Sequence, residues 1–291
     1  MSKILIYSNC HGGKISHMLQ KHEKTSMFTV SYISNFEELK KERISPEHLS
    51  LVQECDYFIY QPFNKTFSDS EYDVEQIKAC LKPSCVVFRI NYYRFKGFYY
   101  QSHYKPFTQH GIYKFLGDRE DFGLHNSFEH ITTTDKQEIK TLLDTMEIRE
   151  DYFQEYFQRE LERFHMLDTK SDVQMYSFFL KHYQTKKLFQ DCFHPTNFFF
   201  YEIFRQTVLS LFDIVLPEED DEFIRPFGEM ITWSQPILPK IQHLLGMTLP
   251  SSFQLFDGCF GEKTVWLDVY DYYYIRLSHA NFDTFLEEYS E

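Results

Sequence analysis

The sequence predicts an α/β protein: a three-layer αβα arrangement with a mostly parallel sheet, followed by a smaller C-terminal α+β part. Over the first hundred residues, short apolar runs alternate with segments in which apolar residues recur at helical spacing. This order is typical of βαβ units, whose right-handed crossovers produce a parallel sheet. A length of 291 residues fits one large domain with a small addition. We place the main domain at residues 1–212 and a C-terminal extension packed on its core at residues 213–291.

The elements of the first half follow from their apolar patterns. Strands are predicted at residues 3–8, 27–33, 56–61 and 84–90. Helices are predicted around residues 15–22, within 35–53 with a break at Pro46, and around 74–81. The run at 3–8 is apolar enough to be a strand buried on both faces, as parallel sheets require.

The second half is more helical, after a ring-rich loop at residues 91–110. Helices are predicted at 134–146, 153–164, 175–183, 195–212 and 237–245, with a closing helix from about residue 280. Pro195 suits the first position of its helix. Short strands are predicted at 187–190 and 265–275. We interpret the acidic run 218–222 as a solvated loop, with an interdomain linker as the alternative.

Composition and charge exclude several classes of protein. Apolar residues make up 43% and charged residues 25%, the balance of a globular chain. A formal net charge of −13 opposes nucleic-acid binding, which needs a basic footprint. The six cysteines are scattered without a CxxC pair, and the N-terminus does not look like a signal peptide. No apolar run approaches the ~20 residues that span a bilayer. We therefore expect a cytoplasmic protein with no nucleic-acid partner and no transmembrane segment.

Two loops carry the reactive side chains. The first, Ser8-Asn9-Cys10-His11-Gly12, lies between the 3–8 strand and the helix after it. In a parallel α/β sheet, ligands bind at the carboxyl ends of the strands, often where a helix N-terminus points. A thiol at that place is in a positive partial field, which favours the thiolate. Cys10 is therefore a candidate nucleophile.

The second loop, Asp191-Cys192-Phe193-His194-Pro195, precedes the last helix of the main domain, at the same predicted edge of the sheet. With Cys10 as nucleophile, His194 as base and Asp191 orienting the imidazole, the two loops would form a catalytic triad. The structural alternatives are that Cys10 packs in the core, His194 caps a helix and Asp191 lies on the surface.

The order of these motifs resembles that of the SGNH/GDSL hydrolases, in which Gly-Asp-Ser follows the first strand and Asp-x-x-His-Pro precedes the last helix. Ser8-Asn9-Cys10-His11 is more similar to the Gly-Asn-Cys-Gln of the WcbI-like polysaccharide-biosynthesis acetyltransferases. The segments Gln235-Pro236-Ile237-Leu238-Pro239 and Leu244-Leu245-Gly246 also resemble that family. The resemblance implies an SGNH-like αβα fold, binding of coenzyme A or acetyl-CoA, and acetyl transfer to a sugar or nucleotide sugar of a surface polysaccharide.

The chain departs from these patterns at three positions. Ser8 stands in place of the family's Gly, which changes the turn, and His11 in place of its Gln, which adds a titratable group beside the thiol. Asn9 replaces the Asp of the hydrolases, so no carboxylate is available there.

Further residues near the strand ends are candidates for binding. Candidates for the oxyanion or the substrate are Asn9, His11, Gln61 and Asn64, with the backbone N–H groups of Cys10 and His11 as the donors of the first loop. Candidates for the phosphates of coenzyme A are Lys14, Arg89, Arg94 and Lys96, because Arg pairs with phosphate and stacks on rings. The alternatives are a loop-capping Asn64 and an ordinary basic surface loop.

Other functions fit the same residues. A thiol esterase would remove acetyl groups with water as acceptor and without coenzyme A. A non-catalytic module would bind a sugar or nucleotide without turnover. A zinc site made by Cys10, His11, Cys192 and His194 is disfavoured, because adjacent ligands such as Cys10 and His11 suit tetrahedral coordination poorly. We therefore expect no metal.

Overall fold

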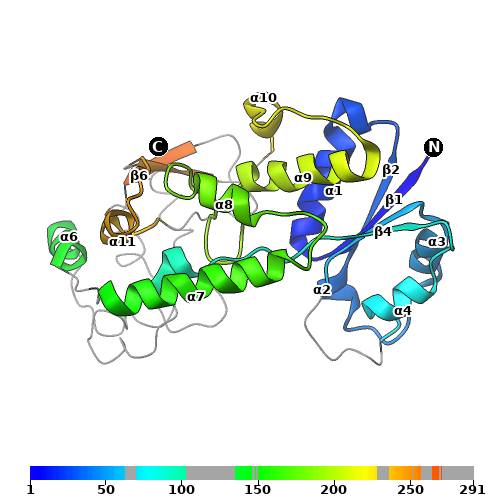
Figure 1. Cartoon of the computed structure of the whole chain (residues 1–291), viewed down its shortest axis with the longest axis horizontal. Helices are drawn as coiled ribbons and strands as arrows, with labels where there is room; N and C mark the ends of the chain where they lie inside the picture. Colours follow the sequence, from blue (N-terminus) through cyan, green and yellow to red (C-terminus); the bar gives the residue numbers. More distant parts are fainter. Residues whose placement is uncertain are drawn as a thin grey trace. The chain divides into compact units, whose positions relative to one another are not determined.

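The structure of the chain is a computed structural model (Figure 1). It describes residues 1–62, 70–102, 135–145, 148, 150–227, 236–250, 252–256, 264–268 and 270. The chain divides into two compact units. The first unit comprises Met1–Tyr93, His165–Phe178 and Asn197–Phe227, and the second comprises Arg94–Phe164, Phe179–Thr196 and Gly228–Glu291. The domain boundary expected at residue 212 stays a prediction.

A parallel sheet forms the centre of the first unit (Figure 1). Its strands are β1 (Lys3–Ser8), β2 (Thr29–Ser34), β3 (Tyr57–Tyr60) and β4 (Val86–Arg89). Their order is β2-β1-β3-β4, and every pairing is parallel. The carboxyl ends of all four strands therefore meet at one edge. This confirms the predicted mostly parallel α/β fold and its first four strands.

Helices cover both faces of this sheet. On one face, α1 (Cys10–Lys21) contacts β1, β2 and α9 (Asn197–Phe212). On the other lie α3 (Pro46–Glu54) and α4 (Val74–Ala79), at the right of Figure 1. Successive strand residues point to opposite faces, so one short apolar strand serves two helical layers. The layers are those of the predicted αβα arrangement.

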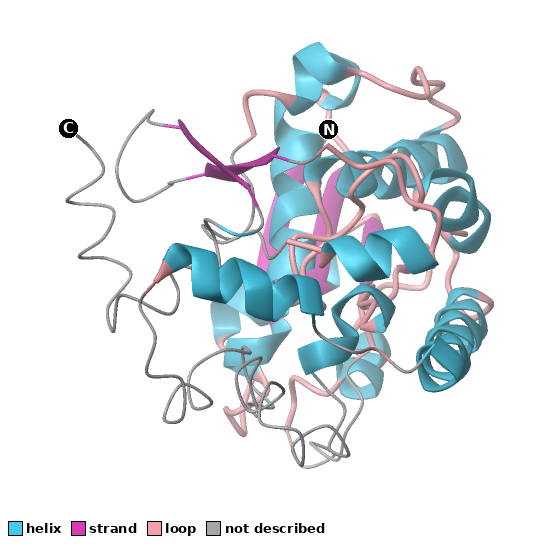
Figure 2. Cartoon of the chain, turned by 90° about the vertical axis from the view of Figure 1, so that its left-hand side faces the viewer, coloured by secondary structure: helices cyan, strands magenta, loops and turns pink. Residues whose placement is uncertain are grey.

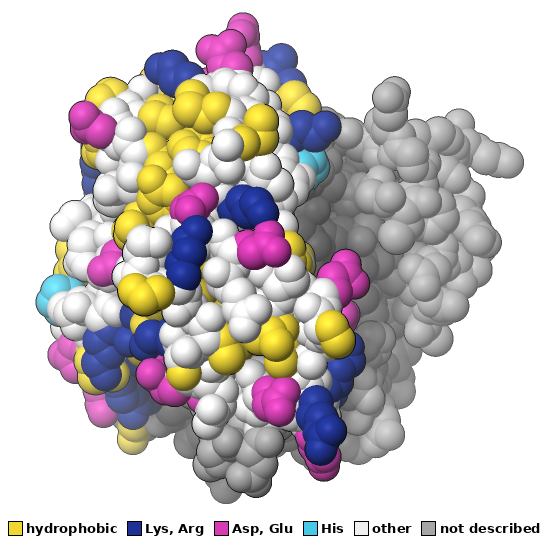
Figure 3. Space-filling view, turned by 90° about the vertical axis from the view of Figure 1, so that its right-hand side faces the viewer, with side chains coloured by type: hydrophobic (Ala, Val, Ile, Leu, Met, Phe, Trp, Pro, Cys, Tyr) yellow, Lys and Arg dark blue, Asp and Glu magenta, His cyan; other side chains and the backbone are white. Residues whose placement is uncertain are grey.

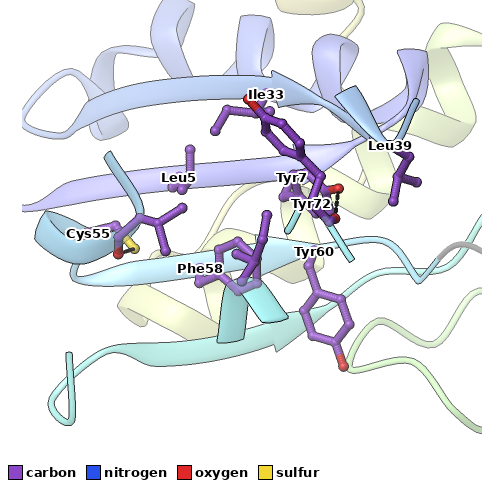
Figure 4. Close-up of a cluster of buried hydrophobic side chains, with 10 residues drawn as sticks. Leu5, Tyr7, Ile33, Leu39, Cys55, Phe58, Tyr60 and Tyr72 are labelled. Atoms are coloured by element: carbon purple, nitrogen blue, oxygen red, sulfur yellow. Dashed lines mark hydrogen bonds between the residues drawn. The ribbon is translucent and has the colours of Figure 1, made fainter. Parts of the chain in front are cut away.

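The core between the sheet and α3 and α4 is built from apolar and aromatic side chains (Figure 4). Leu5 and Tyr7 of β1 belong to the same buried cluster as Val52 of α3 and Ile77 of α4. The Tyr7 hydroxyl donates to the carbonyl oxygen of Tyr72, so its one polar group is satisfied inside the core. Burial raises the pKa of Tyr7, with a smaller contribution from neighbouring acidic groups.

Short elements complete the first unit: η1 (Glu23–Thr25), α2 (Asn35–Glu38) and α10 (Asp221–Ile224). The acidic run predicted as a loop at 218–222 instead contains the start of α10. Asp220 caps this helix by accepting a hydrogen bond from the N–H of Phe223 at 2.9 Å. Acidic side chains in a first helical turn are also favoured by the helix dipole, which explains the difference.

The second unit contains η2 (Gly97–Ser102), α6 (Lys136–Thr145), α11 (Pro239–Leu244) and the antiparallel pair β5 (Ser252–Phe256) and β6 (Thr264–Asp268), drawn as magenta arrows in Figure 2. Two further helices, α7 (Glu150–Asp168) and α8 (Tyr176–His182), contribute residues to both units. These elements confirm the helices predicted at 134–146, 153–164, 175–183 and 237–245. The strand β5 was not predicted, and the closing helix expected from residue 280 lies outside the described residues.

Aromatic rings form the core of the second unit. Phe98 stacks on Phe179 with ring centroids 5.7 Å apart, and Phe179 stacks on Tyr183 at 5.5 Å. Phe95 meets Phe98 edge to face at 4.7 Å. Burying each ring removes a large apolar area from water, so a few aromatic residues are enough to form this core.

Two predictions about the segment before α9 are wrong. Residues 187–190 do not form a strand: Phe189 makes an isolated antiparallel bridge with Pro195. Pro195 does not open the helix, which begins at Asn197. The cause is local pairing, because the N–H of Gln190 donates to the carbonyl oxygen of His194 at 2.7 Å. Backbone groups used inside this loop are not available to extend a sheet.

Candidate active site

The first predicted loop lies where β1 ends and α1 begins. Asn9 has an extended backbone, and its Oδ1 accepts a hydrogen bond from the N–H of His11 at 3.0 Å. Asn is favoured at this N-cap position because its oxygen satisfies an open N–H of the first helical turn. Cys10 is the first residue of α1 and is exposed. The His11 N–H, one of the two expected oxyanion donors, is thus already engaged by Asn9.

Gly12 allows α1 to approach β1 closely. A Cβ atom at this position would lie 2.4 Å from Cβ of Ser8 and 2.9 Å from Cγ2 of Ile6. Both distances are shorter than van der Waals contact, so any larger residue would push the helix away from the strand. The position of Cys10 relative to the sheet therefore depends on Gly12.

The side chains of His11 and Lys14 are turned into the first unit. His11 is 2% exposed, with its ring centroid 4.7 Å from that of Tyr92 and 5.3 Å from that of Phe200. The amine of Lys14, a buried residue, lies 5.6 Å from the centre of the Phe227 ring. These aromatic contacts add a packing role to the binding roles that the sequence predicts for both residues.

Two neighbouring strands hold the segment before Cys10. Oε1 of Gln61, the residue directly after β3, accepts hydrogen bonds from Ser8 Oγ at 2.5 Å and from the N–H of Asn9 at 3.2 Å. The hydroxyl of Tyr32 on β2 donates to the carbonyl oxygen of Asn9 at 2.8 Å. Burial raises the pKa of Tyr32, and the neighbouring Cys10 contributes in the same direction.

Arg89 and Asn64 are the other two candidates near the strand ends. Arg89 is the last residue of β4, and its N–H donates to Oδ2 of Asp172 at 2.6 Å. Its Nε is buried and forms no hydrogen bond with the described residues. Asn64 lies outside the described residues, so its predicted role stays a prediction.

The second predicted loop belongs to the second unit and holds an Asp–His pair. Nδ1 of His194 is 2.9 Å from each carboxylate oxygen of Asp191. Oδ1 of Asp191 also accepts the N–H of Phe193 at 2.7 Å and the N–H of His194 at 2.8 Å. Because the carboxylate only accepts, the geometry favours the proton on Nδ1 and leaves Nε2 as the basic nitrogen. Asp191 thus orients the imidazole.

Cys192, between these two residues, packs in the interior of the second unit. It is 6% exposed, and its carbonyl oxygen accepts the N–H of Phe95 at 3.1 Å. Burial raises the pKa of its thiol, and the nearby Asp191 carboxylate raises it further. A thiol with a raised pKa is a poor metal ligand, because the thiolate is the ligand form. Cys192 is therefore a packing residue.

Basic side chains adjoin this loop within the second unit. The amine of Lys96 lies 5.7 Å from the centre of the Phe193 ring, and burial lowers its pKa. Arg163 of α7 donates to the carbonyl oxygen of Arg94 at 3.1 Å and to Glu160 Oε2 at 2.9 Å. Two of the four predicted phosphate ligands, Arg94 and Lys96, thus belong to a segment whose main chain Arg163 contacts, while the charge of Arg163 is paired with Glu160. Sequence reasoning missed Arg163.

The predicted site residues form two groups. The first unit holds Asn9, Cys10, His11, Lys14, Gln61 and Arg89. The second unit holds Arg94, Lys96, Asp191 and His194. Among the described residues, no three His, Cys, Asp or Glu side chains gather as metal ligands would. Within the same residues, no helix is long and apolar enough to cross a membrane.

One face of the molecule shows how its charged side chains are distributed. On the face shown in Figure 3, Lys and Arg side chains are interspersed with Asp and Glu side chains. A surface that binds a polyanion gathers basic groups into a continuous patch or stripe. The described part of this face has charges of both signs mixed, beside an area of hydrophobic side chains drawn in yellow.

Comparison with known proteins connects this arrangement to one family. The model of the WcbI family, described as a polysaccharide biosynthesis enzyme, matches residues 3–213. No curated protein matches the chain. One solved structure with the same fold is that of WcbI, described as a novel polysaccharide biosynthesis enzyme in its native form without a disulfide bond between coenzyme A and one of its cysteines. The similarity covers 99% of this chain and 89% of that chain, with 15% identity and a TM-score of 0.59. Because the family model spans most of the sequence, the chain belongs to the WcbI family of polysaccharide biosynthesis enzymes.

Proposed function

We propose that this chain is a coenzyme A-dependent acetyltransferase that acetylates a hydroxyl or amino group of a sugar during polysaccharide biosynthesis. The observation that carries the proposal is the Asp191–His194 pair, in which the carboxylate holds Nδ1 of the imidazole at 2.9 Å. A carboxylate in this position fixes the tautomer and stabilises the imidazolium that forms when Nε2 takes a proton. A general base of this kind suits the activation of a sugar hydroxyl.

In the direct route, His194 removes the proton from the acceptor O–H or N–H. The acceptor atom then forms a bond to the thioester carbonyl carbon, and the oxyanion that develops is stabilised by hydrogen-bond donors. The carbonyl re-forms as the carbon–sulfur bond breaks, and the departing sulfur takes the proton from His194. For the oxyanion we propose the backbone N–H of Cys10 and the side chains of Gln61 and Asn64 as donors.

In the covalent route, Cys10 acts first. Its thiolate attacks the thioester carbonyl carbon, the sulfur of coenzyme A leaves, and the acetyl group is held on Sγ. The acceptor, deprotonated by His194, then attacks the acetyl carbon, and the bond from that carbon to Sγ of Cys10 breaks to release the thiolate. The proton on His194 passes to the thiolate of the departed coenzyme A or to water. The exposed position of Cys10 at the start of α1 suits this role. The two routes differ in one product, because only the covalent route gives an acetyl adduct on the protein.

The phosphates of the acetyl donor need basic partners. We propose Arg94 and Lys96 for them, with Arg163 beside them, and Lys14 and Arg89 as further candidates. The donor chemistry fits, because guanidinium groups pair with phosphate oxygens in a planar fork and an amine adds a point charge. The partly buried Lys96 amine has lost part of its hydration, which strengthens its interaction with an anion.

The test is acetyl transfer by the full chain from acetyl-CoA to a panel of nucleotide sugars and monosaccharides, followed by mass spectrometry. We expect an acetylated sugar with the wild-type chain and none above background with His194→Gln. Intact-mass measurement without acceptor distinguishes the routes through the adduct on Cys10. Release of acetate without transfer to any sugar would contradict the proposal and support a thiol esterase. Binding of coenzyme A or a sugar without turnover would support a binding module instead.

A further inference from the structure

The carboxamide of Gln61 is oriented by two donors from the segment directly before Cys10. Oε1 accepts hydrogen bonds from Ser8 Oγ at 2.5 Å and from the N–H of Asn9 at 3.2 Å. Gln61 is 2% exposed, and burying an amide is costly unless its hydrogen bonds are made. The N–H of Asn9 can only donate, so it defines which end of the carboxamide is the oxygen.

The main chain of Gln61, directly after β3, is hydrogen-bonded to two segments on the β1 side of that strand. Its N–H donates to the carbonyl oxygen of Tyr7 on β1 at 2.9 Å. Its carbonyl oxygen accepts Nδ2 of Asn35, a fully buried residue directly after β2, at 3.2 Å. Gln61 therefore connects the carboxyl ends of β2, β1 and β3 within the first unit.

These contacts determine the backbone of Asn9 almost completely. Its N–H donates to Gln61, its carbonyl oxygen accepts the hydroxyl of Tyr32 at 2.8 Å, and its side chain caps α1 through His11. The peptide that links Asn9 to Cys10 is thereby held in one orientation. Rotation about the Cα–Cβ bond is then the main freedom left to the thiol relative to the N-terminus of α1.

We propose that Gln61 is a positioning residue that sets the reactivity of the Cys10 thiol. The proposal rests on the proposed function in taking Cys10 as the reactive thiol of the site. Without the Gln61 oxygen, the Asn9 N–H and the Ser8 hydroxyl lose a buried acceptor, so the segment has to shift to reach another one. The shift moves the thiol away from the N–H groups of the first turn of α1, where a thiolate is stabilised.

Two substitutions separate geometry from charge. Gln61→Met has a similar length but offers neither hydrogen bond a comparable acceptor. Gln61→Glu keeps an acceptor for both donors but places a negative charge near the thiol, which disfavours the thiolate. We expect Gln61→Met to slow the alkylation of Cys10. We expect Gln61→Glu to raise the pH at which its alkylation is half-maximal by roughly 0.5–1 unit, because a nearby like charge disfavours the thiolate.

The experiment measures iodoacetamide alkylation of the full chain across pH, with each cysteine quantified by peptide mass spectrometry. Cys80, exposed at the end of α4, is the internal reference, because it shares the reagent and the solution. Gln53→Met, at an exposed position of α3, is the matched control. The proposal predicts that only the Gln61 variants change the ratio of Cys10 to Cys80 alkylation. Circular dichroism and Tm verify that each variant is folded.

An unchanged Cys10 profile in both folded Gln61 variants would overturn the proposal. If Gln61→Met does not fold, Gln61→Glu and Ser8→Ala, which removes one donor, give the same test. The alkylation measurement does not involve coenzyme A, so the positioning role of Gln61 and the proposed acetyltransferase function can be refuted separately. A Cys10 profile that responds to Gln61 in a chain without acetyl transfer would refute the proposed function alone, and an unresponsive profile in an active transferase would refute the positioning role alone.

Discussion

The loop that presents Cys10 is held by neighbouring strands, whereas the Asp191–His194 pair is held by hydrogen bonds within its own loop. Around Cys10, the cap that Asn9 forms with His11 is joined by hydrogen bonds from outside the loop, to Gln61 after β3 and from Tyr32 on β2. Around His194, Asp191 accepts hydrogen bonds from residues two and three positions later in the chain. One loop depends on the assembled sheet and the other on a local turn.

Substitutions in the two loops are therefore expected to have different effects on stability and on the reactive side chains. A change near Cys10 acts on contacts between strands and a helix, so it is expected to affect the free energy of unfolding together with the position of the thiol. A change at Asp191 acts on a few bonds inside one loop, so it is expected to affect the imidazole far more than the fold.

The largest effect is expected for Asp191→Asn on acetyl transfer. Asn keeps an oxygen that accepts the two backbone N–H groups, but its amide nitrogen donates toward Nδ1 and moves the imidazole proton to Nε2. The rate should then fall by about 10²–10⁴-fold, because Nε2 can no longer act as a base. The urea midpoint should remain close to that of the wild type.

The control is Asp213→Asn, at an exposed position after α9, which should leave the rate unchanged. A large loss of stability in Asp191→Asn with an undiminished rate per folded molecule would show that the pair is structural rather than catalytic.

The next effect is on stability, at the contact between α1 and β1. Gly12→Ala places a Cβ 2.4 Å from Cβ of Ser8 and should lower the free energy of unfolding by about 1–3 kcal/mol, the range for overpacking. Gly13→Ala is the matched variant, because its Cβ would be 3.5 Å from the nearest atom, in the ring of Tyr32. Since Ala is the better helix former, that variant should gain up to about 1 kcal/mol. Urea unfolding of both measures the difference, and equal effects would refute the close approach.

A smaller loss is expected for Tyr32→Phe. This variant removes the hydrogen bond from the hydroxyl to the carbonyl oxygen of Asn9 and should cost about 0.5–1.5 kcal/mol of unfolding free energy. Tyr57→Phe on β3 is the comparison, because the Tyr57 hydroxyl forms no hydrogen bond in the described part of the chain. Chemical denaturation compares the two variants. If both variants lose the same unfolding free energy, the hydrogen bond between Tyr32 on β2 and the Cys10 loop contributes nothing to stability.

The smallest effect concerns Lys96 and pH. Burial lowers the pKa of this amine from its ordinary value of 10.5, so between the folded and unfolded pKa values the unfolded chain binds more protons. The contribution of Lys96 to unfolding free energy therefore rises with pH across that window. Lys96→Met should be stabilised relative to the wild type at neutral pH, and this gain should shrink toward pH 10.5. Urea midpoints at the two pH values test it, with Lys170→Met, at an exposed position, as control.

The sequence predicts the sheet well, because parallel strands are short apolar runs between helices. The strand at residues 3–8 has the predicted bounds. The strand predicted at 84–90 is shortened at both ends, because β4 comprises Val86–Arg89. The run at 187–190 has the same apolar character, yet it pairs locally through Phe189 and Pro195. Which partner an apolar segment finds depends on contacts that its own composition does not contain.

The same limit applies to the candidate site. Gln61 is found from sequence because it follows a strand, but its partners Ser8 and Asn9 are more than fifty residues away. Arg163 was missed because its helix was interpreted from apolar residues alone. A signal for it was present: Glu160 and Arg163 are three residues apart, the spacing at which opposite charges pair on a helix.

The central claim is that the chain binds coenzyme A through the basic residues beside the Asp191–His194 loop. Isothermal titration of the full chain with coenzyme A tests it most directly. We expect saturable binding that weakens at least roughly tenfold, about 1.4 kcal/mol, in the double variant Arg94→Met and Lys96→Met. No binding by the wild-type chain at millimolar ligand, or equal affinity in the wild type and the double variant, would contradict it.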